Sequence, residues 1–135
     1  TRINYNINRY SDASISYDYV DSTQYNSSTE NQQAEVRRPR NLININYNNN
    51  FFNNLSINSN IFYSSKVKDT DFSSYPYQNV YMSSYFLFNT TLNYDIDSKN
   101  KVSLIFKNIF NREYNVVNDF NTPGFEVLIN YRNNF

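Results

Sequence analysis

The sequence has 135 residues, with 12 Lys or Arg balanced by 12 Asp or Glu, so its formal net charge is zero. A neutral chain without a basic stripe lacks the electrostatic footprint of a nucleic-acid-binding protein. It contains no Cys and no His, which excludes thiol chemistry, zinc ligation by these residues and histidine acid–base catalysis.

Aromatic residues make up 19% of the chain, with 14 Tyr and 11 Phe, while charged residues make up 18%. Disordered chains lack aromatic residues, so this composition indicates a folded protein. No apolar run approaches the ~18 residues of a membrane-spanning helix. A barrel wall fits the composition, because half of each strand faces a polar lumen. The frequent Asn, Ile, Tyr and Lys are attributed to an A/T-rich genome and carry no functional meaning here.

Seven segments alternate apolar and polar side chains with a period of two, which predicts strands with one apolar and one wet face. In chain order they cover residues 1–8, 13–23, 37–49, 54–67, 80–95, 101–110 and 125–135. The last is the clearest, since Phe125, Val127, Ile129, Tyr131 and the terminal Phe135 share one face. Each segment is close to the ~9–11 residues of a tilted membrane strand. We therefore predict an all-β fold, an antiparallel transmembrane β-barrel.

The connections alternate in length along the chain. Short links are predicted at residues 9–12, 49–53 and 96–100, and long links at 24–36, 68–79 and 111–122. Bacterial barrels have short periplasmic turns and long extracellular loops, so the C-terminus is expected on the periplasmic side. Seven is an odd number and residue 1 already lies in an alternating segment. We expect residues 1–135 to be the C-terminal ~7 strands of a larger barrel of about 22 strands.

Several segments carry a family resemblance. They are SYDYVD at 16–21, RRPR at 37–40, SSYPYQ at 73–78, FKNIFNREY at 106–114 and the terminal TPGFEVLINYRNNF. Together they resemble the C-terminal part of the barrel of TonB-dependent outer-membrane receptors, most closely the cobalamin receptors. The resemblance implies that the N-terminal plug domain, with its TonB box, is absent from this chain.

The resemblance also implies site residues. Arg37 lies where cobalamin receptors place a ligand-contacting Arg, and Phe72 takes the place of a ligand-contacting Tyr. Phe keeps the ring but lacks the hydroxyl, so one hydrogen bond to the ligand would be missing. Phe135 matches the terminal residue that the outer-membrane assembly machinery recognises. The implied partners are membrane lipid and lipopolysaccharide, the TonB complex acting through the plug, and a periplasmic ligand-binding protein.

Other interpretations of these residues remain open. Arg37 and Arg38 could anchor a strand end against headgroups or lipopolysaccharide phosphate, and Phe72 could be a loop-packing aromatic. Tyr residues at strand ends are expected to form the interface girdle: Tyr17, Tyr19, Tyr47, Tyr63, Tyr94 and Tyr131.

The acidic residues give no metal or catalytic site. The turn from Asp95 to Asn100 lacks the Gly and the distal Glu of a calcium loop. Asp69 and Asp71 are expected to be solvated charges on an outer loop. We predict no catalytic residue, no metal and no cofactor.

The predicted function is therefore transport rather than catalysis. The chain is expected to be part of an outer-membrane transporter for cobalamin or a similar large, scarce nutrient. The alternative is the same fold carrying a siderophore or another metal chelate. More distant alternatives are a non-transport surface protein rich in Asn and Tyr, and a soluble β-sandwich enzyme.

Overall fold

The computed structural model describes residues 1–27, 30–73 and 75–134, and every regular element in them is a strand. Seven strands form one sheet in which each strand pairs antiparallel with the next. Their order across the sheet is β1 (Arg2–Asn8), β2 (Ser11–Tyr19), β5 (Asn41–Phe52), β6 (Leu55–Ser64), β9 (Tyr85–Asp95), β10 (Asn100–Lys107) and β11 (Glu126–Asn133). This up-and-down order confirms the all-β antiparallel prediction with seven strands.

Two hairpins were missing from the sequence prediction. β3 (Thr23–Asn26) pairs with β4 (Asn31–Ala34), and β7 (Val67–Asp71) pairs with β8 (Gln78–Met82). Most of each hairpin lies in a segment expected to be a long link, 24–36 or 68–79. The expected strand over 80–95 is in fact divided, because β8 ends at Met82 and β9 begins at Tyr85. The third long connection, 108–125, contains no strand.

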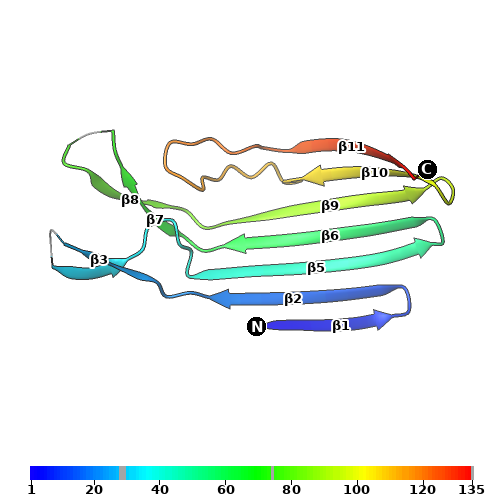
Figure 1. Ribbon diagram of the computed structural model, residues 1–135, viewed down its shortest axis with the longest axis horizontal. Coiled ribbons are helices and arrows are strands. Elements are labelled where there is room, and N and C mark those ends of the chain that lie inside the picture. Colours follow the sequence, from blue (N-terminus) through cyan, green and yellow to red (C-terminus); the bar gives the residue numbers. More distant parts are fainter. Residues whose placement is uncertain (28–29, 74, 135) are drawn as a thin grey trace.

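Long and short connections lie at opposite ends of the sheet (Figure 1). The β3–β4 and β7–β8 hairpins and the β10–β11 loop extend from one end, which we call the loop end. The β1–β2, β5–β6 and β9–β10 turns close the other end, where the chain also finishes. This arrangement agrees with the predicted alternation of link lengths.

One face of the sheet is apolar and uncovered. The strand register aligns its side chains in rows that cross several strands. An aromatic-rich row near the loop end contains Tyr17, Ile43, Tyr63 and Phe86. A second row near the turn end contains Leu55, Tyr94, Val102 and Tyr131. Three rows lie between them. Two are mostly aliphatic: Ile15, Ile45, Ile61 and Phe88, and then Ile57, Leu92, Leu104 and Ile129. The third, between these two, combines rings with hydroxyl groups: Tyr47, Ser59, Thr90 and Phe106.

The spacing of the two outer rows matches a lipid layer. They are eight residues apart along β6, from Leu55 to Tyr63. At ~3.4 Å per residue this is about 27 Å along the strand, or roughly 19–22 Å along a barrel axis at the ~35–45° tilt of membrane barrels. The apolar band of such barrels is ~25 Å tall and has aromatic residues at both edges.

The sheet has almost no apolar core of its own. Among the residues that the structure describes, Met82 is the sole buried hydrophobic side chain, whereas Ile129 is 74% exposed. Single-layer sheets of soluble domains bury their apolar face against another layer, and a contiguous exposed apolar face indicates an interaction surface. The described residues supply no such second layer for this face.

The opposite face is polar and carries two ladders of side-chain amides. In the first, Asn89 Nδ2 donates to Asn60 Oδ1 at 3.4 Å, Asn60 Nδ2 to Asn46 Oδ1 at 2.9 Å, and Asn46 Nδ2 to Ser14 Oγ at 3.3 Å. In the second, Asn93 Nδ2 donates to Asn58 Oδ1, Asn58 Nδ2 to Asn48 Oδ1, and Asn48 Nδ2 to Asp12 Oδ2, all at 2.8–2.9 Å. Each ladder joins β9 to β2 through β6 and β5.

In both ladders each amide NH₂ donates toward β2. A group at one end of each ladder fixes this direction of the hydrogen bonds. The backbone N–H of Asn108 is only a donor, and it donates to Asn89 Oδ1 at 2.9 Å. The Asp12 carboxylate is only an acceptor, and it receives Asn48 Nδ2. The abundant Asn therefore has a structural role on the polar face, beyond the genome composition to which the sequence analysis attributed it.

Candidate ligand-binding loops

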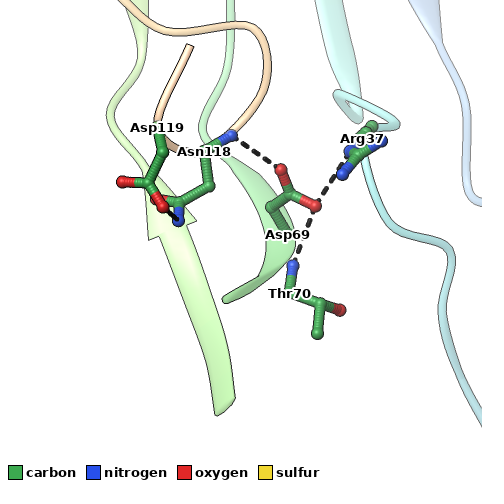
Figure 2. A network of polar contacts seen from close by, with 5 residues as sticks. All are labelled: Arg37, Asp69, Thr70, Asn118 and Asp119. Carbon is green, nitrogen blue, oxygen red and sulfur yellow. Dashed lines mark hydrogen bonds and ion pairs between the residues drawn. The ribbon is translucent and has the colours of Figure 1, made fainter. Parts of the chain in front are cut away.

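Three segments of the loop end meet at one buried carboxylate, Asp69 in β7 (Figure 2). Asp69 Oδ1 accepts hydrogen bonds from Arg37 Nε at 2.9 Å and from the Thr70 backbone N–H at 2.8 Å. Its Oδ2 accepts one from the backbone N–H of Asn118 at 2.8 Å. Arg37 belongs to the β4–β5 link and Asn118 to the β10–β11 loop. The carboxylate therefore ties all three long connections together.

Asp69 has no exposed surface, so the prediction that it is a solvated charge is wrong. Burial alone would raise the pKa of the Asp69 carboxyl. The hydrogen bonds from Asn118, Thr70 and Arg37, with the positive charge of Arg37, outweigh burial and lower this pKa below its ordinary value. The group is thus a carboxylate at neutral pH. Its partners are 32 and 49 residues away in sequence, so no local pattern could have indicated its burial.

Arg37 is held by both its backbone and its side chain. Its φ is 60°, an uncommon value for a residue other than Gly, and its N–H donates to the carbonyl of Lys68 at 2.8 Å. Its side chain, paired with Asp69, remains 44% exposed. The geometry presents a fixed, partly accessible guanidinium at the loop end. Contact between Arg37 and a ligand stays a prediction.

Phe72 follows directly after β7 and belongs to an exposed aromatic cluster with Tyr75 and Tyr77. The Phe72 and Tyr77 rings meet edge to face with centroids 5.0 Å apart, and the Tyr75 and Tyr77 rings with centroids 5.8 Å apart. Tyr75 is 89% exposed and Phe72 is 62% exposed. The three rings form an exposed apolar surface at the hairpin tip. Phe72 lies three residues beyond Asp69, which pairs with Arg37. The two predicted ligand residues, Arg37 and Phe72, therefore lie in the same part of the loop end.

The β10–β11 loop is shaped by two Asn residues of the FKNIFNREY segment. Asn108 and Asn111 have φ of 48° and 47°, a left-handed conformation that Asn tolerates better than most residues. Asn108 Nδ2 donates to the carbonyl of Arg112 at 2.9 Å, and Asn108 Oδ1 accepts from the Arg112 N–H at 2.8 Å. Asn111 Oδ1 accepts from the N–H of Phe125 at 2.9 Å. These bonds close the loop and return the chain to β11.

The single glycine of the chain is explained by this loop. A Cβ on Gly124 would lie 2.5 Å from Asn111 Oδ1, closer than such atoms approach. Glycine at this position lets the Asn111 side chain pass over the backbone and reach Phe125.

Two acidic residues outside this network, Asp97 and Asp71, stabilise turns. Asp97 Oδ1 accepts hydrogen bonds from the backbone N–H groups of Lys99 and Asn100 in the β9–β10 turn. Bonds from the Asn100 side chain, first among several, lower the pKa of Asp97. Asp71 accepts the Ser73 N–H at 2.8 Å, which lowers its pKa. Within residues 1–27, 30–73 and 75–134, no three acidic side chains come together as a metal site.

Phe135, the predicted assembly signal, lies outside the described residues. No helix in the described part of the chain has the length and apolar character needed to cross a membrane.

An antiparallel sheet with a lipid-sized apolar band, a polar face and long loops at one end is the architecture of an outer-membrane barrel wall. Comparison of the sequence with protein-family models and with curated proteins finds no match. Twelve solved protein chains match the structure. One is in the structure of the FpvAI–pyocin S2 complex, with a TM-score of 0.79 and 13% sequence identity.

That match covers 99% of this chain but 19% of the solved chain, so this chain spans about a fifth of its length. The fold is therefore an all-β antiparallel sheet that matches part of a TonB-dependent receptor barrel. The similarity is to a transporter barrel and not to an enzyme family. Cobalamin recognition finds no support in this match.

Proposed function

We propose that this chain is part of the barrel wall of a TonB-dependent outer-membrane transporter that takes up a siderophore or another metal chelate. The observation that carries the proposal is the uncovered apolar face with its two aromatic-rich rows, joined to a polar face that needs an aqueous lumen. The matched receptor barrel supports it. In this proposal residues 1–135 belong to the C-terminal part of the barrel, and the plug domain is supplied by other parts of the protein.

A chelate is favoured over cobalamin for two reasons. The matched barrel belongs to a siderophore receptor. Phe72 also lacks the hydroxyl that the corresponding Tyr of cobalamin receptors offers to the ligand. Cobalamin is the second candidate, because the motif resemblance in the sequence points to its receptors.

The loops supply the ligand-binding chemistry. The Phe72, Tyr75 and Tyr77 cluster offers apolar contact, and Arg37 offers a positive charge that suits an anionic chelate. The Asp69 network fixes Arg37 and the β10–β11 loop in one arrangement, which reduces the entropy lost when ligand binds. The TonB complex would then act on the plug, the ligand would pass to a periplasmic binding protein, and Phe135 would direct barrel assembly.

Competition binding on the full-length transporter in outer membranes tests the substrate. A panel of ferric siderophores and cobalamin is titrated against wild type, Arg37→Ala and Phe72→Ala. Saturable chelate binding that both variants weaken supports the proposal. Saturable cobalamin binding with no chelate binding selects the second candidate. Phe52→Ala is the matched control, because Phe52 is a 71% exposed ring at the turn end, where no ligand contact is expected.

A further inference from the structure

A basic pocket lies at the loop end, on the apolar side of the sheet. It has a volume of about 550 Å³, and four of its lining residues are cationic: Arg38, Arg40, Lys66 and Lys68. The remaining lining includes Glu35, Tyr63 and Tyr81. The cations come from the β4–β5 link and from the segment that leads from β6 into β7. Two connections far apart in sequence thus place like charges together.

The charges around this pocket do not cancel. Arg38 Nε lies 3.5 Å from Glu35 Oε2, and Arg40 Nη2 lies 3.0 Å from Asp21 Oδ1. Lys68 Nζ donates to the neutral amide oxygen of Gln33 at 3.1 Å. Lys66 Nζ lies 5.7 Å from the centre of the Tyr81 ring. Four cations face two carboxylates, so the pocket keeps an excess of two positive charges.

The position of the pocket relates it to the lipid and not to the lumen. Tyr63, in its lining, belongs to the aromatic-rich row that borders the apolar band. Asn41, also in the lining, accepts a hydrogen bond from the hydroxyl of Tyr17 in the same row. In β7, Lys68 and Asp69 are consecutive and therefore point to opposite faces of the hairpin. The pocket and the ligand-binding network are separate sites.

We infer that this pocket binds the phosphate groups of an outer-leaflet glycolipid, with the acyl chains lying along the apolar face below it. Arg38 and Arg40 supply guanidinium groups for phosphate oxygens, and Lys66 and Lys68 add positive charge. An aromatic row directly beneath a cationic pocket suits an amphiphile with an anionic head and apolar chains. The inference rests on the proposed outer-membrane location, and it does not depend on which nutrient is transported.

The test uses the full-length transporter in detergent, titrated with fluorescent bis-phosphorylated lipid A. The variant Arg38→Gln/Lys66→Gln is expected to bind roughly 30-fold more weakly, the effect of removing two cations near an anionic surface. The charge-conserving Arg38→Lys/Lys66→Arg variant is expected to retain most of the affinity. Arg9→Gln/Lys99→Gln is the matched control, since it removes one Arg and one Lys from turns at the other end. Lys68→Gln is a second test that leaves every ion pair in place.

Equal lipid A affinity in wild type, Arg38→Gln/Lys66→Gln and Lys68→Gln would overturn the inference. Competition by inorganic phosphate as strong as that by lipid A would assign the pocket to a soluble phosphate instead. Heat-modifiable migration on gels confirms that each variant forms a barrel. Chelate and cobalamin binding are measured on the same preparations. If Arg38→Gln/Lys66→Gln loses lipid A binding and keeps nutrient binding, the lipid site is separate from the nutrient site. If the wild-type protein binds lipid A but no nutrient, the transport proposal is refuted and the lipid inference stands.

Discussion

Replacing Asp69 with Asn tests whether one carboxylate holds the loop end together. The amide has nearly the shape of the carboxylate but only one acceptor oxygen. If that oxygen keeps its bonds from Arg37 and Thr70, the amide NH₂ faces the N–H of Asn118, and two donors oppose each other. Losing a buried hydrogen bond to a charged group costs about 1.5–3 kcal/mol. The weakened ion pair adds less than about 1 kcal/mol, because the Arg37 side chain is 44% exposed.

The expected total is about 2–4 kcal/mol of local stability, which corresponds to roughly 30- to 1,000-fold faster hydrogen exchange at the Asn118 amide. Mass-spectrometric exchange on the full-length barrel measures it in peptides from the β10–β11 loop. Asp71→Asn is the matched control, since Asp71 is also in β7 and its carboxylate accepts the N–H of Ser73 in its own turn. Equal protection of Asn118 in wild type and Asp69→Asn would refute the network as the stabilising element.

The Asp69 network also predicts that the loops lose stability at acidic pH. The folded pKa of Asp69 lies below its ordinary value, so the carboxylate stabilises the loops fully above the unfolded pKa of ~3.9. This stabilisation is lost as the pH falls through the folded pKa. Corrected for intrinsic exchange rates, protection at Asn118 is expected to be constant from about pH 5 to 8 and to fall below about pH 4. Asp69→Asn should remove that fall.

Three further changes test the two faces and the loop. Ile45→Arg places a charge in the middle of the apolar band and is expected to cost about 2–4 kcal/mol in urea unfolding of the folded barrel, whereas Asn44→Arg, on the polar face and outside both amide ladders, should cost little. Gly124→Ala forces the Asn111 side chain aside and should cost about 1–3 kcal/mol, seen as faster exchange at the start of β11 and not in β1. Asp12→Lys opposes the Asn48 donor at the fixed end of one ladder, so the urea midpoint should fall by the equivalent of about 1 kcal/mol, while Asp12→Asn should leave it nearly unchanged.

The seven main strands were predictable because each one leaves a period-two pattern over many residues. In the proposed membrane location Ile43, Ile45 and Tyr47 face lipid while Asn44 and Asn46 face water, so the two solvents impose the pattern locally. The β3–β4 hairpin has no such constraint. Its second strand, Asn31–Ala34, lies outside the lipid band and shows no alternation of apolar side chains, so only pairing with β3 defines it.

The candidate site was predictable only in part. The resemblance to receptor motifs directed attention to Arg37 and Phe72, and both lie at the loop end. Asp69 was misjudged because a lone Asp in a polar segment is usually solvated, and its burial depends on distant chain segments. The left-handed Asn108 and Asn111 offered a usable signal, since Asn within a short polar-rich segment after a strand often takes this conformation.

The open edges of the sheet determine what must surround it. Among the described residues, β1 pairs only with β2 and β11 only with β10, which leaves a row of backbone N–H and C=O groups along each edge. An unpaired backbone group costs several kcal/mol in hydrocarbon, and closed barrels avoid this cost by leaving no edge. In the proposed outer-membrane location lipid covers the apolar face, yet lipid cannot satisfy the edges. Both demands are met together only if further strands continue the sheet beyond β1 and β11 into a closed barrel, with the amide ladders facing its lumen.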